Sequence, residues 1–231
     1  MAEHQSVEQG LEQHIRDMGT DLGTLYNVLT NEVAWVHAKW AQYQQLYTRS
    51  SEQITLLNEV ARHFFGIIQD ALLEDIILHL AKLTDPPQSM GKDNLTLRRL
   101  PAFISNAQLT AEVTDLVEAA RAACESSRAW RNRRLAHRDL GLALAIATEP
   151  LPGISYATIK AALAAMAAVL NCLEGHYWNS ETAYEHFLTE GGEADSMVYY
   201  LSEGVRAEEQ WRERLQQGKP LPEDIAPRNQ V

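Results

Sequence analysis

The sequence predicts an all-α protein built as a bundle of long antiparallel helices. Apolar residues recur at spacings of three and four over long stretches, which is the helical period. No β-branched run with a period of two is present, and no Asn-Gly or Asp-Gly hairpin signal. Gly (12) and Pro (8) are scarce among the 231 residues, while 45% are hydrophobic and 22% charged. This composition indicates a folded chain with a substantial core.

The N-terminal part is expected to form three helices, over Val7–Met18, Asp21–Tyr47 and Ser51–Leu83. In the second, aliphatic and aromatic residues from Leu22 to Tyr47 make one apolar stripe that faces a core. Ser50 and Gln53 form a capping box ahead of the third helix. The third helix is apolar on more than one side, which predicts a central position, and Asp85-Pro86-Pro87 ends it.

Five further helices are expected along the rest of the chain. Residues 86–93 read as a polar loop, and Asn94 is a good N-cap for a short helix from Leu95 that Pro101 stops or kinks. The predicted helices after it cover Thr110–Arg138, a stretch from Ser155 as N-cap to Tyr177, Thr182–Thr189 and Ser196–Gln217. The sequence therefore divides into a helical bundle over residues 1–180, an acidic helical extension over 181–218 and a flexible tail over 219–231.

Net charge and cysteine content limit the classes of function. The net charge of −11 argues against a protein that coats DNA. Cys124 and Cys172 cannot make a disulfide scaffold, so we expect reduced thiols and a cytoplasmic protein. The N-terminus lacks the pattern of a signal peptide. The most apolar run, Ala161–Leu170, is about half the ~20 residues that a membrane span needs, so no membrane association is expected.

Familiar patterns for cofactors and metals are absent. The sequence has no Gly-rich phosphate loop, no HExxH, no CxxC and no GxSxG. His176 and His186 are ten residues apart and lack the spacing of helical metal ligands. We therefore expect neither a cofactor nor a metal.

Charge is unevenly distributed. Glu181–Glu213 holds nine acidic residues and two arginines, whereas Ser126–Arg138 holds no acid. This arginine cluster has five members: Arg128, Arg131, Arg133, Arg134 and Arg138. On an α-helix several of them share a broad face, where like charges repel unless an anion or an acid opposes them. Phosphate suits the planar guanidinium, but arginines in a last helical turn also complement the helix dipole.

Arg131 and His137 together offer chemistry for cleaving RNA without a metal. A histidine can take the proton of a ribose 2′-hydroxyl or protonate the 5′ leaving oxygen. An arginine can stabilise the negative charge of the phosphorane. The two are six positions apart in the sequence, so they lie about 120° apart on an ideal helix. They converge on one phosphate only if the helix end bends, or if a second copy of the chain faces the first across a two-fold axis.

The arginine cluster carries a family resemblance. Arg131-Asn132-x-x-x-Ala136-His137 resembles the R-x(4–6)-H signature of the HEPN superfamily. Three further stretches resemble its abortive-infection type U (AbiU-like) branch: Asp75-x(6)-Lys82-Leu83-Thr84-Asp85-Pro86, Lys92-Asp93-Asn94-Leu95-Thr96-Leu97 and Leu135-Ala136-His137-Arg138-Asp139. The resemblance covers residues 22–173 and leaves 180–231 uncovered.

This resemblance implies a homodimer that pairs two motifs in one cleft and cleaves RNA without a metal, in phage defence or a toxin–antitoxin system. Carried over to this sequence, Arg131 and His137 would be catalytic and Asn132 would assist or orient. No Tyr follows His137 closely, so silencing by nucleotidylation of such a Tyr is not supported. An antitoxin or another defence protein would be a further partner. The alternative is a non-catalytic HEPN-like module that binds a protein partner or a nucleotide.

Other residues around the motif have two interpretations each. Asp75 either pairs with Arg131 or orients His137, or it is an exposed helix acid. Asp139 either holds the His137 ring or terminates the helix. Three more arginines, Arg128, Arg134 and Arg138, are the expected RNA contacts.

Overall fold

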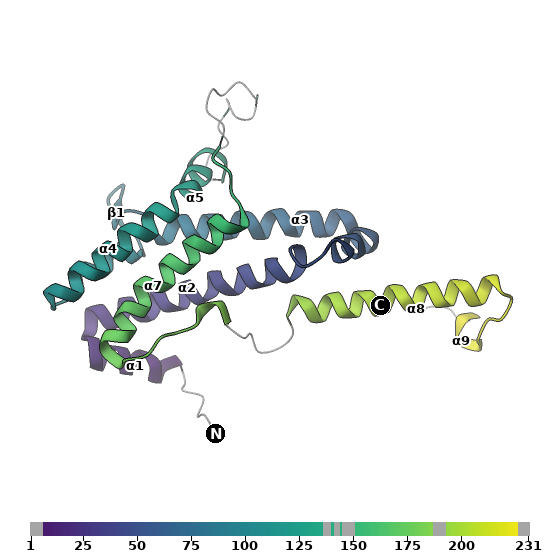
Figure 1. Cartoon of the computed structure of the whole chain (residues 1–231), viewed down its shortest axis with the longest axis horizontal. Helices are drawn as coiled ribbons and strands as arrows, with labels where there is room; N and C mark the ends of the chain where they lie inside the picture. Colours follow the sequence, from purple (N-terminus) through teal and green to yellow (C-terminus); the bar gives the residue numbers. More distant parts are fainter. Residues whose placement is uncertain (1–6, 136–139, 141–143, 145–150, 187–192, 226–231) are drawn as a thin grey trace. The chain divides into compact units, whose positions relative to one another are not determined.

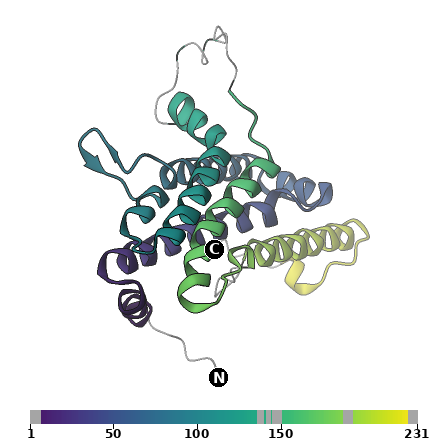
Figure 2. The same ribbon diagram turned by 60° about the vertical axis from the view of Figure 1, so that its left-hand side comes forward.

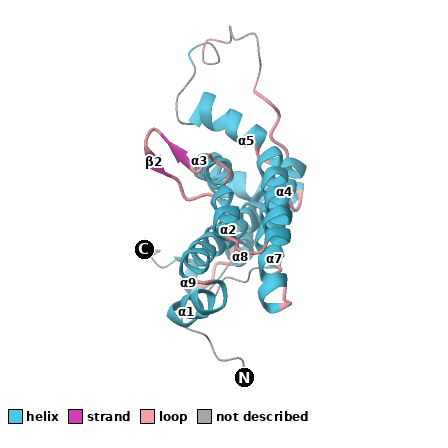
Figure 3. Cartoon of the chain, turned by 90° about the vertical axis from the view of Figure 1, so that its left-hand side faces the viewer, coloured by secondary structure: helices cyan, strands magenta, loops and turns pink. Residues whose placement is uncertain are grey.

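The computed structural model describes residues 7–135, 140, 144, 151–186 and 193–225. Within them the chain is almost entirely helical, as expected, and Figure 3 shows one small hairpin beside the helices. Two compact units divide the chain. The first holds Met1–Ala41 and Ala71–Leu188, and the second holds Gln42–Asp70 and Thr189–Val231. This division groups residues 42–70 with the C-terminal segment. The expected boundaries at residues 180 and 218 stay predictions.

Helices α1 (Val7–Met18) and α2 (Thr20–Tyr47) meet at a tight joint in the first unit. Gly19 connects them at a φ of 84°, a conformation that favours glycine. At Gly23 the two helices come so close that an added Cβ would lie 2.4 Å from the carbonyl oxygen of His14. The predicted bounds of both helices are confirmed to within one residue.

Helix α3 (Ser51–Leu83) runs antiparallel to α2. Two polar contacts in the first unit show the direction: Lys39 Nζ lies 2.5 Å from an Asp75 carboxylate oxygen, and a Glu32 carboxylate oxygen lies 2.6 Å from His79 Nε2. Apolar side chains of both helices are buried within the bundle, including Leu29, Val33, Val36, Ile76, Ile77 and Leu80. Burial also lowers the pKa of His79, so the ring is neutral at physiological pH.

Helices α4 (Ala107–Ala123) and α7 (Tyr156–Trp178) lie side by side and complete the core of the first unit, as Figures 1 and 2 both show. Asn106 caps α4 by accepting from the Leu109 N–H at 3.0 Å. Ser155 begins α7 with the expected cap, here a full capping box with Thr158. In the described chain α7 is the one helix long and apolar enough to cross a membrane. Its apolar residues are instead core residues of the bundle: Ile159, Leu163, Met166, Val169, Leu170 and Leu173.

The segment after α3 departs from the predicted polar loop. Strands β1 (Gln88–Ser89) and β2 (Lys92–Asp93) form a two-stranded antiparallel hairpin, each strand too short for an alternating pattern to appear in the sequence. The predicted helix from Leu95 is wrong. The helix is instead the 3₁₀ helix η1 (Leu97–Phe103), and Thr96 caps it, because Asn94 donates its amide to the Pro86 carbonyl at 2.8 Å.

The predicted single helix over residues 110–138 is also wrong. Its first part is α4, which ends at Ala123, and α5 (Glu125–Trp130) follows. Cys124 separates α4 from α5, because its φ of −93° and ψ of 9° are not those of an α-helix. After Trp130 the chain continues as η2 (Arg131–Leu135), a π-helix with i to i+5 hydrogen bonds. The arginine cluster therefore begins in α-helical geometry and continues outside it.

In the second unit, α8 (Ala194–Gln216) and α9 (Pro222–Ile225) join residues 42–70. Helix α3 is kinked here at Ala61, which has a φ of −161° and a ψ of 68°. Ser50 accepts from the Gln53 N–H at 3.2 Å, but the Gln53 side chain donates to the carbonyl of Leu46 at 2.9 Å, so only half of the predicted capping box is present. Of the expected short helix over 182–189, residues 187–189 lie outside the described residues, and the described part contains the 3₁₀ turn η3 (Tyr184–His186).

Replacing Gly23 with alanine should destabilise the protein, because the new methyl group would overlap the α1 backbone. We expect the free energy of unfolding to fall by about 1–3 kcal/mol, measured by urea denaturation. Gly10→Ala is the matched control, since Gly10 is also helical and has no atom within 4 Å of an added Cβ. That change should stabilise by about 0.5–1 kcal/mol. Equal effects of the two substitutions would contradict the close approach.

Candidate active site

A bidentate ion pair joins Arg131, the first residue of η2, to Asp85, just beyond the end of α3. The two terminal nitrogens of the guanidinium donate to the two carboxylate oxygens at 2.5 and 2.8 Å. Both side chains are largely shielded, at 22% and 15% exposure. Such a planar fork fixes orientation as well as distance, so Arg131 has one defined geometry in the folded chain.

Arg128 lies in α5, about one helical turn before Arg131, and its side chain is also held by contacts within the protein. Its guanidinium donates to the Thr84 hydroxyl at 3.1 Å, to the carbonyl of Arg121 at 2.7 Å and to the Glu125 carboxylate at 2.5 Å. The side chain is 13% exposed. These internal contacts occupy the arginine that we expected on an RNA-binding surface, because helix α5 lies against the end of α3 at this point.

Thr84 and Asp85 are themselves held firmly. Thr84 is buried and donates to the carbonyl of Leu80 at 3.1 Å. Thr96 is fully buried and its hydroxyl lies 2.9 Å from both the Leu83 and the Asp85 carbonyl oxygens. Thr84 is therefore part of the core, and Asp85 is attached to the core through its backbone carbonyl, so both contacts of the arginines are made to a well-held stretch.

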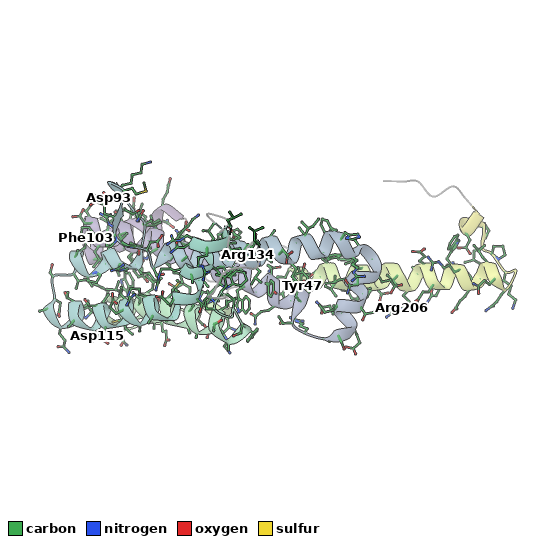
Figure 4. All side chains as sticks on the ribbon, turned by 90° about the horizontal axis from the view of Figure 1, so that it is seen from above. Tyr47, Asp93, Phe103, Asp115, Arg134 and Arg206 are labelled. Atoms are coloured by element: carbon green, nitrogen blue, oxygen red, sulfur yellow. The ribbon has the colours of Figure 1, made fainter. Side chains whose placement is uncertain are left out.

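Arg134 presents charge on the surface beside this ion pair. Its guanidinium stacks on the Trp130 ring at 5.1 Å and lies 3.7 Å from Glu74 of α3. The side chain is 54% exposed, and Figure 4 labels it. Trp130 donates its indole N–H to the Pro152 carbonyl at 2.7 Å, which holds the ring in place under the guanidinium. Asn132 is exposed on the same π-helix.

The carboxylate that contacts Arg131 is not the one considered from the sequence. Of the interpretations offered for Asp75, a pairing with Arg131 is not the one observed, because Asp75 pairs with Lys39 of α2 and is half exposed. Three predicted residues, His137, Arg138 and Asp139, lie outside the described residues. Asp85 was missed as a site residue, although it belongs to the Thr84-Asp85-Pro86 stretch that carried the resemblance.

Other chemical groups nearby are unreactive in character. Burial raises the pKa of the Cys124 thiol to about 11, and that of Cys172 to about 11 as well. Both thiols are therefore protonated at neutral pH and poor nucleophiles. In the part of the chain that the structure describes, no group of three or more His, Cys, Asp or Glu side chains is placed to hold a metal ion.

Comparison with known proteins identifies the domain. Residues 19–196 match the family model for AbiU2, a HEPN family. The chain belongs to the AbiU2 family. It therefore carries a HEPN domain of the abortive-infection type, which confirms the resemblance seen in the sequence and extends it to both sides of residues 22–173. No curated protein and no solved structure matches the chain.

The AbiU2 match also separates the chain into shared and additional parts. It begins at Gly19, directly after α1, and includes both Asp85 and Arg131, but it ends at Ser196, in the first turn of α8. The rest of α8 and all of α9 lie beyond the family domain.

The ion pair between Arg131 and Asp85 should stabilise the AbiU2 fold measurably. In a double-mutant cycle with Asp85→Ala and Arg131→Ala, we expect a coupling energy of about 1–3 kcal/mol, because the pair is bidentate and largely shielded. The same cycle on Lys39 and Asp75 is the control, and it should give about 0–1 kcal/mol since Asp75 is half exposed. Urea denaturation measures both. A coupling no larger than that of the control pair would show that the fork contributes geometry without stability.

Proposed function

We propose that this protein is a metal-independent endoribonuclease of a phage-defence or toxin–antitoxin system, in which Arg131 and His137 act on the RNA phosphate. The observation that carries the proposal is the fixed orientation of Arg131 at the start of η2. A guanidinium has five N–H donors, and Asp85 takes two of them. The terminal nitrogens keep one N–H each for an anion such as the phosphate of RNA.

The reaction needs only groups that the motif supplies. His137 would remove the proton from the ribose 2′-hydroxyl, whose oxygen then attacks the adjacent phosphorus. The bond to the 5′ oxygen breaks, and a protonated histidine returns a proton to that oxygen. Arg131 would stabilise the extra negative charge on the phosphorane, and Asn132 would orient the phosphate or the histidine. The products are a 2′,3′-cyclic phosphate and a 5′-hydroxyl.

Two copies of the chain would build each site. The Asp85 carboxylate neutralises the Arg131 charge within its own subunit, so one motif alone offers a phosphate little net positive charge. A two-fold axis would place a second motif opposite the first and supply the missing groups. The end of α-helical geometry at Trp130 is also in keeping with the bend that convergence of Arg131 and His137 in one chain requires.

RNA would cross the surface at Arg134 and Trp130. Arg134 is the exposed arginine whose position the stacked ring defines. Arg133 and Arg138 would extend this contact, whereas Arg128 supports the fold. The proposed protein acts in the cytoplasm, on RNA, with an antitoxin or another defence protein as a further partner.

Cleavage of RNA in the presence of EDTA tests the proposal. We expect purified wild type to cleave mixed single-stranded and structured RNA and to leave cyclic-phosphate ends. Arg131→Ala and His137→Ala should each lower the rate on the order of 100-fold or more. Asp85→Asn should lower it as well, because Arg131 loses its orientation. Arg206→Ala is the matched control, an exposed arginine of α8 whose loss should leave the rate unchanged.

Mixing the two inactive variants distinguishes the composite site from one built within a single chain. A heterodimer of Arg131→Ala and His137→Ala keeps one intact site if each site takes its arginine and histidine from different subunits. Random pairing then restores about a quarter of the wild-type rate. No restoration, with exchange of subunits verified, would place the site within one chain. A stable wild-type protein without any cleavage would favour the non-catalytic binding module.

A further inference from the structure

Almost every side chain of helix α8 is at least partly exposed to solvent. It has 23 residues, and Ala194 is its single buried residue. Apolar side chains nevertheless recur on it at helical spacings, among them Val198, Leu201 and Val205. A helix of this kind gains stability mainly from packing its apolar face, since propensity alone is marginal. Most of α8 also lies beyond the AbiU2 match, so the family domain does not account for it.

Both ends of α8 are anchored within the second unit. At its start, the Ala194 and Asp195 N–H groups donate to Gln42 and Gln45 at 2.8 and 3.2 Å. Near its end, Arg214 forms a bidentate pair with Asp224 at 2.7 and 2.8 Å, where α9 folds back. The middle of the helix lies between these anchors and presents its apolar side to a groove.

This groove has a volume of about 430 Å³ and lies between α8 and the part of α3 that precedes the kink at Ala61. Its apolar lining includes Val60, which is 39% exposed, and Tyr200, which is 73% exposed. Gly204 also lines it and has no atom within 4 Å of an added Cβ, so a ligand's backbone can approach closely there.

Carboxylates dominate the charge around the groove. Glu59, Glu208 and Glu209 line it together with one cation, Arg212, which pairs with Glu208 at 2.7 Å. RNA and anionic lipid surfaces would be repelled by this edge. A second copy of α8 would bring like charges together. A ligand that fits this groove presents apolar side chains to Val60 and Tyr200 and positively charged side chains to Glu59 and Glu209.

We propose that the α3–α8 groove docks a basic amphipathic helix of a partner protein. The apolar face of that helix would cover the middle of α8, and its Lys or Arg residues would reach the carboxylates at the edge. This inference does not depend on ribonuclease activity, because the groove lies in the second unit and shares no residue with the Arg131 site.

A designed peptide of leucine and lysine serves as the probe. It has about 18 residues, or five helical turns, with leucine on one face. Fluorescence anisotropy with the full-length protein should show saturable binding. A peptide of the same composition in scrambled order and a leucine–glutamate helix should bind at least about tenfold more weakly, since each lacks one of the two required features.

Two pairs of variants locate the binding. Tyr200→Ser should weaken it about tenfold, whereas Tyr199→Ser should not, because Tyr199 is also exposed, at 60%, but does not line the groove. Glu209→Lys should weaken it similarly, and Glu213→Lys, one turn further along α8, should not. Equal effects within either pair, or no binding to wild type, would overturn the proposal. So would a wild-type dimer that Tyr200→Ser dissociates in sedimentation velocity, since the occupant would then be a second copy.

Discussion

The bidentate contact between Arg131 and Asp85 fixes the end of α3 against the start of η2, and the arrangement around the motif depends on it. Asp85 follows Thr84 just beyond the end of α3. The hydroxyls of Thr84 and Thr96 donate to backbone carbonyls of this stretch and hold it in place. Arg128 binds Thr84 one helical turn before Arg131 binds Asp85. Thr84 and Asp85, which are adjacent in the sequence, thus bind two arginines one helical turn apart. Together these contacts set the position and the rotation of α5 relative to the end of α3.

This arrangement gives the arginines of one short segment different tasks. Arg128 donates hydrogen bonds to groups inside the protein, Arg131 is oriented by the Asp85 carboxylate, and Arg134 stacks on Trp130 at the surface. A general attraction between cations and a helix C-terminus does not explain them, because each has a specific side-chain contact and the α-helix ends at Trp130. Specific contacts also resolve the like-charge repulsion that the sequence alone suggested, since Glu125, Asp85 and Glu74 each lie beside one arginine.

In the second unit, polar contacts at its two ends hold helix α8 in place. Side-chain amides of α2 hold the first turn of α8, and a carboxylate of α9 holds its last turn, so polar contacts at two ends replace an apolar core face. The middle of the helix is left with apolar side chains in contact with solvent. In the AbiU2 bundle, by contrast, α4 and α7 bury their apolar faces against each other along their length.

The sequence alone determined the all-α class, the bounds of α1, α2 and α3, the N-cap at Ser155, the end of α3 ahead of Pro86, and the family. These depend on local signals: the helical period, a side chain that accepts from a backbone N–H, and a proline that forbids helix. Four features needed the tertiary structure: the break at Cys124, the π-helix, the kink at Ala61 and the choice of Asp85 over Asp75 as the partner of Arg131. The partner of Arg131 depends on which side chains the packed helices bring together, and the other three carry no local signal in the sequence. The sequence offered Asp75 as a partner of Arg131 and gave Asp85 no such role, but α2 places Lys39 beside Asp75, whereas the end of α3 places Asp85 beside Arg131.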